Sequence, residues 1–151
     1  MKYSRDELNS YYRYALALTN HSNDAYDLVH DALIKVEGRL LFKRQAYIRM
    51  VIRNHYFDTI RKGSKNEYVE SVPEDASVEL ESVLVNQMEL SSLLEQIKPE
   101  ERELIYLIEV EGQTYKEVAK MLQVSQGTLL SKLHRAKKKL LKWSKKNETA
   151  S

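Results

Sequence analysis

Residues 114–136 have the sequence TYKEVAKMLQVSQGTLLSKLHRA, and this stretch decides the class of fold that we expect. Thr114 and Glu117 match a capping box, in which each side chain accepts a hydrogen bond from an unpaired amide at a helix start. Ala119 is small enough to let a second helix cross closely. After a turn, Ser125 can cap a longer helix. The stretch therefore predicts a helix-turn-helix.

The second helix of this motif has one apolar face and one polar, basic face. The apolar residues recur at helical spacing and predict burial of Leu129, Leu133, Ala136 and Leu140. On the other face, side chains near the helix start can meet base edges in a major groove, and later ones lie where phosphates pass. The base-edge candidates are Gln126, Gly127, Thr128 and Ser131, and the phosphate candidates are Arg135, Lys138 and Lys142. The alternative is a packed helical hairpin with a solvated lysine face.

Charge is distributed unevenly along the chain, although the net charge is only +2. Residues 1–65 carry twelve Lys and Arg against seven Asp and Glu. Residues 66–111 carry two against thirteen, and residues 112–151 carry ten against two. Two basic ends around an acidic middle indicate two separate contacts with a polyanion such as a nucleic acid. Solvated charge on ordinary helices is the alternative.

The first 63 residues predict three helices that pack as one unit. Ser4 and Glu7 form another capping-box pattern, and the apolar stripe that follows is Leu8, Tyr11, Tyr12 and Ala15. Residues 22–37 are the clearest amphipathic segment, with inner positions Ala25, Leu28, Val29, Ala32, Leu33 and Val36. Gly38 ends this helix, and a third helix is expected over residues 44–62.

The apolar period fails after the third helix, which divides the chain in two. Five Glu and Asp residues lie between 67 and 79 without helical periodicity, and they predict a flexible acidic linker. We therefore predict an all-α fold of two small helical domains, at residues 1–63 and 83–146, joined by a linker over 64–82. Residues 147–151 are expected to form a disordered tail.

Two polar surfaces of the first domain are candidates for binding. The third helix presents Tyr47, Asn54, Asp58, Arg61 and Lys65 along one stripe, with Arg49 and Arg53 beside it. Such side chains can stack on or hydrogen-bond to unpaired bases, although an intrahelical polar network explains the same spacing. The second helix carries Asp27, His30, Asp31 and Lys35 outside its apolar face. This surface is either a protein docking site or simply solvated.

Composition excludes several classes of function. The chain has no cysteine and four scattered histidines, which excludes disulfides and leaves no ligand set for a metal. We expect no cofactor and no enzymatic activity, because there is no glycine-rich phosphate loop and no nucleophile beside a base. No apolar run approaches the ~18 residues that span a bilayer, and the first residues do not resemble a signal peptide. We therefore expect a cytoplasmic protein without membrane contact.

Three segments resemble RNA polymerase sigma factors of the extracytoplasmic-function (ECF) group. Residues 24–31, DAYDLVHD, resemble the D-A-x-D-L-V-Q-D segment of region two. Residues 47–61 are similar to that region's helix W-L-x-x-I-A-x-N-x-x-x-D-x-x-R. Residues 114–136 are similar to the S-Y-x-E-I-A-x-x-L-x-I-S-x-G-T-V-x-S-R-L-x-R-A segment of region four. Three matches in this order are a far more specific signal than any one of them.

The resemblance implies a transcription initiation factor with a region-two-like and a region-four-like domain, whose partners are core RNA polymerase and promoter DNA. The implied surface for the clamp helices of the largest polymerase subunit is Asp27, Leu28, Val29, His30 and Asp31, whose apolar members can equally belong to the core. The implied contacts to the melted minus-10 strand are Tyr47, Arg53, Asn54, Asp58 and Arg61. The implied contacts to the minus-35 duplex are Gln126, Gly127, Thr128, Ser131, Lys132, Arg135 and Lys138. An anti-sigma factor is a further implied partner, which the apolar second helix invites.

The chain departs from the family pattern in four places. Only 16 residues separate His30 from Tyr47, so the loop that usually captures a flipped base is shortened. Tyr47 stands where the pattern has tryptophan, and His30 stands where it has glutamine. Gln123 stands where the turn often has glycine. Two other functions remain open: a polymerase-independent helix-turn-helix regulator, and a decoy that docks on polymerase without initiating transcription.

Overall fold

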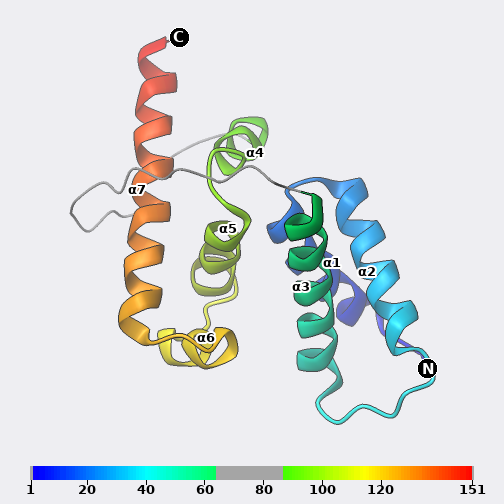
Figure 1. Ribbon diagram of the computed structural model, residues 1–151. Coiled ribbons are helices and arrows are strands. Elements are labelled where there is room, and N and C mark those ends of the chain that lie inside the picture. Colours follow the sequence, from blue (N-terminus) through cyan, green and yellow to red (C-terminus); the bar gives the residue numbers. More distant parts are fainter. Residues whose placement is uncertain (1, 64–86, 151) are drawn as a thin grey trace. The chain divides into compact units, whose positions relative to one another are not determined.

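The computed structural model describes residues 2–63 and 87–150, and both ranges are helical (Figure 1). They belong to two compact units, the first within Met1–Val69 and the second within Glu70–Ser151. The described ranges contain no strand, so the predicted all-α fold with two small helical domains is confirmed. The expected linker over residues 64–82 lies outside the described residues, and the exact domain boundaries stay predictions.

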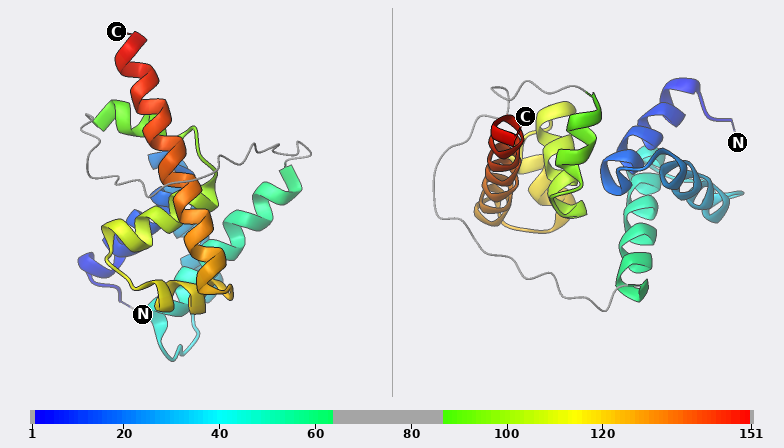
Figure 2. Two further views of the ribbon diagram at one scale, coloured as in Figure 1. Left: turned by 90° about the vertical axis from the view of Figure 1, so that its left-hand side faces the viewer. Right: turned by 90° about the horizontal axis from the view of Figure 1, so that it is seen from above.

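The first unit is a bundle of α1 (Arg5–Thr19), α2 (Ser22–Val36) and α3 (Arg44–Gly63), in which each helix packs against the other two. Figure 2 shows the same bundle from two further sides. Burial of apolar side chains holds it together, at roughly 25 cal/mol for each Å² removed from water. The buried apolar residues are Tyr11, Tyr14, Ala15, Leu18, Ala25, Leu28, Val29, Ala32, Val36, Ile48 and Ile52.

The buried face of α1 is rotated from the predicted one. Leu8 was expected inside but is exposed, whereas Tyr14 is fully buried. The capping box at this helix is half formed: the Ser4 hydroxyl accepts from the Glu7 amide at 3.1 Å. The Glu7 carboxylate instead pairs with Arg44 at the start of α3. This contact between distant segments brings the Glu7 side of α1 into the core.

The second unit consists of α4 (Gln87–Leu94), α5 (Pro99–Ile105), the π-helical turn η2 (Tyr106–Val110), α6 (Tyr115–Leu122) and α7 (Gln126–Ala150). The long helix α7 packs against α4, α5 and α6, and Figure 1 shows it beside α5. Its predicted inner stripe is confirmed. The buried apolar residues of the unit include Leu93, Ile97, Leu104, Ile105, Leu107, Val118, Ala119, Leu129, Leu133, Ala136 and Leu140.

The predicted disordered tail over residues 147–151 is wrong for residues 147–150. Helix α7 continues to Ala150. The physical reason is local: residues 128–150 contain neither glycine nor proline and include many lysines and leucines, which favour the helix. None of the helices in the described ranges has the length and apolarity that crossing a bilayer requires.

Candidate nucleic-acid and polymerase interfaces

The helix-turn-helix begins with a complete capping box. The Glu117 amide donates to the Thr114 hydroxyl at 3.0 Å, and the Thr114 amide donates to the Glu117 carboxylate at 3.0 Å. The backbone hydrogen bond from Thr114, followed by its side-chain hydrogen bond, lowers the pKa of Glu117. The predicted start of α6 is therefore confirmed.

The turn between α6 and α7 contains a residue with left-handed backbone conformation. This residue is Gln123, which stands where the family pattern often has glycine. Gln123 has φ of 58°, and the Val124 amide donates to the Ala119 carbonyl at 3.0 Å. The left-handed backbone costs a residue with a Cβ roughly 1–2 kcal/mol. The turn thus pays a small local strain to bring α7 across α6 at Ala119, which is buried.

We expect Gln123→Gly to raise the free energy of unfolding of the second unit by about 0.5–1 kcal/mol, because relief of the strain exceeds the added chain entropy of glycine. Chemical denaturation measures this change. Lys120→Gly, at an exposed position inside α6, is the matched control and should lower stability by roughly 1 kcal/mol. A loss of stability in Gln123→Gly would contradict the strain at the turn.

The start of α7 is capped and open to solvent. Ser125 accepts from the Thr128 amide at 3.1 Å and donates to the Thr128 hydroxyl at 2.9 Å, which confirms the predicted cap. Gln126, Gly127 and Ser131 are exposed on the same part of the helix. The candidate base-edge residues therefore lie together on an accessible surface, although the Thr128 hydroxyl already has a partner.

The basic residues of α7 divide into two groups. The first group faces the rest of the unit: Lys139 pairs with the buried Glu101 at 3.1 Å, and Lys137 pairs with Glu109. Lys132, a candidate duplex contact, lies 3.9 Å from Glu100 and so leans toward α5. The second group comprises the phosphate candidates: Arg135 and Lys138 are part-exposed, and Lys142 is exposed.

The candidate strand-binding residues lie along α3. Asn54 is exposed, and Asp58 and Arg61 form an ion pair one turn apart, which is the intrahelical contact that the alternative interpretation expects. The Arg53 guanidinium lies 4.8 Å from the ring of Phe57. Tyr47, close to the start of the helix, is exposed and accepts a hydrogen bond from Arg39 at 3.1 Å. The candidates thus share one helix, with Tyr47 nearest to the loop that precedes it.

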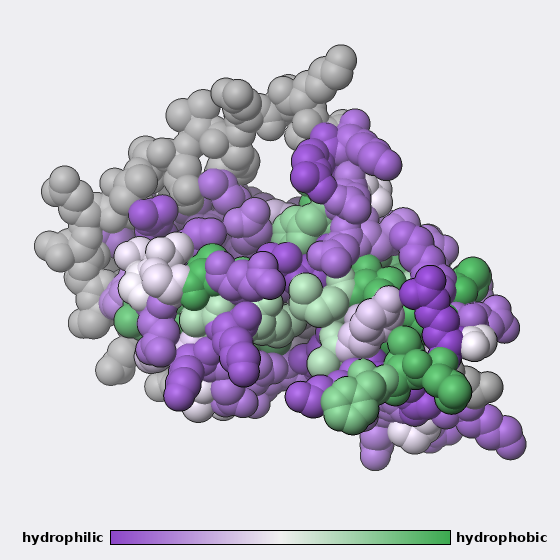
Figure 3. All heavy atoms as spheres, turned by 60° about the horizontal axis from the view of Figure 1, so that its bottom comes forward, coloured by the Kyte–Doolittle hydropathy of each residue, from purple (hydrophilic) through white to green (hydrophobic). Residues whose placement is uncertain are grey.

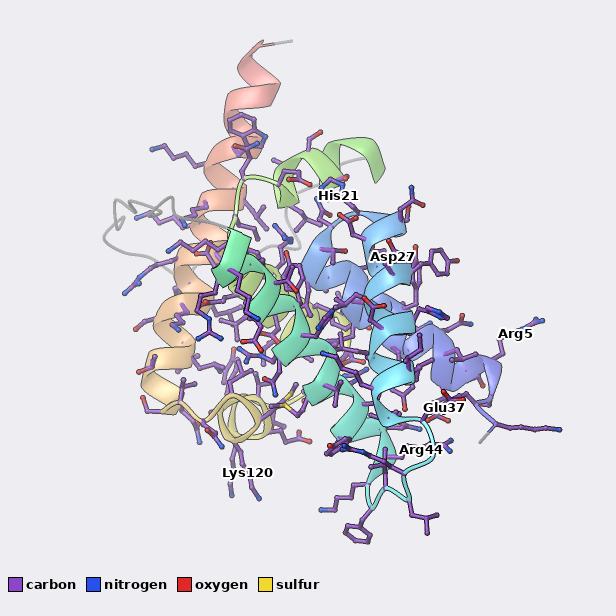
Figure 4. The ribbon with its side chains drawn as sticks, turned by 45° about the vertical axis from the view of Figure 1, so that its right-hand side comes forward. Arg5, His21, Asp27, Glu37, Arg44 and Lys120 are labelled. Atoms are coloured by element: carbon purple, nitrogen blue, oxygen red, sulfur yellow. The ribbon has the colours of Figure 1, made fainter. Side chains whose placement is uncertain are left out.

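The candidate polymerase surface on α2 is smaller than the five residues that the resemblance implies. Leu28 and Val29 are only 6 % and 8 % exposed, so they belong to the core of the first unit. Their helical phase turns them toward α1 and α3, which leaves the exposed residues Asp27, His30 and Asp31. Figure 4 labels Asp27 on α2. A partner on this side of α2 would therefore meet these polar side chains together with Ile34, which lies on the same stripe and is 55 % exposed.

Asp31 takes part in a polar bridge between α2 and α3. His55 on α3 lies with Nε2 3.5 Å from the Asp31 carboxylate and with Nδ1 2.8 Å from the ammonium of Lys35. The bridge links the exposed edge of α2 to α3. A partner that binds Asp31 would therefore bind a residue that also contacts His55 of α3.

Loop 37–43, between α2 and α3, lies in the shortened segment between His30 and Tyr47, and sequence reasoning did not name its apolar residues as a surface. Leu40 is fully exposed and Phe42 is 88 % exposed. Green, hydrophobic side chains gather on the face that Figure 3 brings forward, where this loop lies. The signal was available in the sequence, since Leu40, Leu41 and Phe42 follow a helix-ending glycine and belong to neither helical stripe.

Backbone conformation at both ends of loop 37–43 is left-handed. Gly38 has φ of 79°, which glycine adopts without penalty, but Lys43 has φ of 53°. For lysine this conformation costs roughly 1–2 kcal/mol. The next residue, Arg44, begins α3 and donates to the Glu7 carboxylate through Nε at 2.9 Å and through Nη2.

A buried hydrogen-bond network surrounds the Glu7 carboxylate. The Tyr11 hydroxyl donates to Glu7 Oε2 at 2.5 Å, and the Tyr3 ring lies 4.8 Å from the Arg44 guanidinium. Burial opposes ionisation of Glu7, but hydrogen bonds from Arg44 and Tyr11 and the charge of Arg44 outweigh it and hold its pKa below 4.5. Burial and the hydrogen bond to Glu7 raise the pKa of Tyr11. Glu7, Tyr11 and Arg44 are called the α1–α3 clamp below.

We expect the α1–α3 clamp to make the first unit sensitive to acid. Because the pKa of Glu7 is lower in the folded chain than the ordinary 4.5, its stabilising effect is complete above that pH. The effect is lost as the pH falls through the folded-state value. Glu7→Gln should therefore flatten the decline in unfolding free energy below pH 4.5, measured by urea unfolding at several pH values.

The matched control for the acid prediction is Asp6→Asn, which removes an exposed carboxylate from the same helix. It should leave more of the acid-induced decline in place than Glu7→Gln does. Equal flattening by the two variants would show that net charge, rather than the clamp, causes the decline.

Comparison with known proteins identifies the family. Residues 87–140 match the model of sigma-70 region 4. The chain is 30 % identical over 141 residues to an RNA polymerase sigma-E factor of Streptomyces avermitilis, which covers 89 % of this chain and 79 % of that protein. It is 26 % identical over 149 residues to the ECF RNA polymerase sigma factor SigE of Mycolicibacterium smegmatis. That match covers 90 % of this chain but only 58 % of the longer protein.

The fold is also similar to a solved structure, the sigma factor RpoE of Bartonella quintana in complex with the anti-sigma factor NepR. The TM-score is 0.63, with 24 % identity and 90 % coverage of both chains. The chain therefore belongs to the RNA polymerase sigma factors. One of its relatives, SigE of Mycolicibacterium smegmatis, is a factor of the extracytoplasmic-function group.

Proposed function

We propose that this chain binds core RNA polymerase in the cytoplasm and directs it to promoter DNA. Helix α7 contacts the minus-35 duplex, and the first unit contacts the melted minus-10 strand. The observation that carries the proposal is the capped helix-turn-helix, whose exposed start of α7 lies in the segment that matches sigma-70 region 4. The contacts with the minus-10 strand and with the polymerase are separate parts of the proposal, and each is argued below from its own residues.

The duplex contact needs a helix that enters a major groove, about 12 Å wide. Gln126, Gly127 and Ser131 are exposed at the start of α7, where the recognition helix of such a motif meets base edges. Arg135 follows one turn later and, in the described part of the chain, has no ion pair with a carboxylate. These features support base contacts first along α7 and phosphate contacts further on.

The strand contact needs flat and hydrogen-bonding groups for unpaired bases. Tyr47 supplies an exposed ring and Asn54 an exposed amide, both on α3. Arg61 is largely exposed despite its pair with Asp58 and can shift that pairing toward a phosphate. The exposed apolar side chains of loop 37–43 add surface for a base to pack against.

The polymerase contact is assigned to the exposed residues of α2, Asp27, His30 and Asp31. These polar side chains, with the exposed Ile34 among them, suit a partner that offers both charged and apolar side chains. An anti-sigma factor is proposed as a second, competing partner. The support is the fold shared with RpoE of Bartonella quintana, which is bound to the anti-sigma factor NepR.

The experiment is co-purification of core RNA polymerase with the tagged chain, followed by abortive transcription on a promoter library. Stable binding with initiation at a shared two-block sequence supports the proposal. Asp27→Lys should weaken polymerase binding, while the same reversal at the exposed Asp6 of α1 should not. Salt-sensitive binding to duplex DNA without affinity for polymerase would instead indicate an independent regulator. Polymerase binding without initiation would indicate a decoy.

A further inference from the structure

Loop 37–43 has two unfavourable features, one in its side chains and one in its backbone. Its apolar side chains at Leu40 and Phe42 face solvent, and Lys43 has a left-handed backbone. Such a conformation persists only when the surrounding structure determines it more strongly than the local backbone does. Free apolar side chains would otherwise be expected to fold back against the unit and leave water.

The α1–α3 clamp holds the loop in this conformation at the end where α3 begins. Arg44 directly follows the left-handed Lys43, and its guanidinium is engaged by two atoms of the Glu7 carboxylate. Glu7 is itself buried, and it accepts a further hydrogen bond from Tyr11. Two parallel charge-assisted hydrogen bonds fix orientation as well as distance. A rotation of the first residue of α3 that relieved the strain at Lys43 would therefore displace Arg44 from these hydrogen bonds.

A second contact closes the loop from the other side. Arg39 Nη1 donates to the Tyr47 hydroxyl at 3.1 Å, eight residues further along the chain. Tyr47 lies on the first turn of α3, whose position the clamp sets, and its amide donates to the Lys43 carbonyl at 3.1 Å. The geometry of the loop is thus linked through Tyr47 to the candidate strand-binding face.

We propose that Glu7 and Arg44 are positioning residues for the melted strand. They hold loop 37–43 and Tyr47 in the arrangement that receives unpaired bases, without touching the DNA themselves. The guanidinium of Arg44 donates to Glu7 through Nε and Nη2 and lies over the Tyr3 ring, so its contacts tie α3 to α1. Figure 4 shows Arg44 beside this loop. The inference rests on the proposed contact between the first unit and the melted strand.

The test measures how tightly the full chain, assembled with core polymerase, binds a single-stranded minus-10 oligonucleotide. Arg44→Gln is expected to weaken strand binding about tenfold, equivalent to ~1.4 kcal/mol, with polymerase co-purification and duplex binding unchanged. Arg5→Gln, at an exposed position of the same bundle, is the matched control and should have no effect. Unchanged strand binding by folded Arg44→Gln overturns the proposal.

A positioning role for Arg44 leads to a second expectation, which the substitution Lys43→Gly tests. Lys43→Gly removes the Cβ that makes the left-handed backbone unfavourable, so the loop should need the clamp less. Arg44→Gln should then weaken strand binding only about threefold in the Lys43→Gly background, against about tenfold in the original chain. Equal losses in both backgrounds would mean that Arg44 acts by direct contact, and would overturn the positioning role.

Two further measurements keep the inference separate from folding and from the proposed function. If Arg44→Gln unfolds the first unit, Glu7→Gln takes its place with the same expected loss, because its amide still accepts from Tyr11. In the free chain, ¹⁵N relaxation of the amides of residues 39–43 should show a more mobile loop in either variant. If the wild-type chain binds no strand but the loop is still more mobile in the variants, the proposed function is refuted while the role of the clamp in the loop stands. An equally ordered loop in the variants refutes the clamp.

Discussion

Leu129→Ala is expected to lower the free energy of unfolding of the second unit by about 2–5 kcal/mol, because Leu129 is fully buried on α7 and its truncation leaves a cavity. Loss of that support should loosen the packing of α7 and reduce duplex binding. Trp143, the single tryptophan of the chain, lies on α7, so its fluorescence follows urea unfolding of this unit alone.

The first unit should be unaffected by Leu129→Ala, because the two compact units have separate cores. Ile52→Ala is the matched variant: it empties a fully buried site in α3 and should destabilise the first unit by a similar amount. Residue-resolved hydrogen exchange distinguishes the two. Loss of protection in both units after either substitution would show that the chain unfolds as one cooperative domain.

Asn54→Ala and Arg135→Ala are expected to impair different steps of initiation. Asn54 is an exposed amide on the candidate strand-binding face, and removing a base contact of this kind costs roughly 1–3 kcal/mol. Opening of a duplex promoter should therefore fall about 10- to 100-fold, with affinity for the closed duplex preserved. Permanganate footprinting of the polymerase complex measures opening.

Arg135→Ala should instead weaken closed-complex affinity about tenfold and reduce the salt dependence of binding by about one unit of slope. The matched controls are Asn9→Ala and Arg13→Ala, at exposed positions of α1 outside both candidate faces. Neither control should change opening or duplex affinity. The division of labour is refuted if Asn54→Ala and Arg135→Ala lose duplex binding equally and open pre-melted DNA equally well.

Local sequence signals predicted the elements well, because each depends on residues within one or two turns. Thr114 and Glu117 form their capping box, Ser125 caps α7, and Gln123 takes the left-handed conformation at the turn. Hydrophobic periodicity likewise placed most of the inner face of α2, with Ala25, Leu28, Val29, Ala32 and Val36 all buried. Leu33, which was also predicted inside, is half-buried. The disordered tail was wrong because helix propensity continues past the packed part of α7.

The candidate site was less completely predicted, because exposure depends on which helices meet. Leu28 and Val29 match the family pattern in sequence, yet packing against α1 and α3 withdraws them from any partner surface. Lys132 leans toward Glu100 on α5 instead of standing free on the face of α7. No spacing within one helix predicts such contacts, since the partner residue lies on another element.

By itself, therefore, the sequence determined the helices, their caps, the helix-turn-helix and the family, since these depend on short-range hydrogen bonds and on periodicity. Only the tertiary structure decided that Glu7 leaves its own capping box to pair with Arg44, 37 residues away. It also decided that Leu40 and Phe42 remain exposed. The reason is that a buried carboxylate is stable only beside a charge that the fold brings to it, and the loop takes the conformation that this pairing allows.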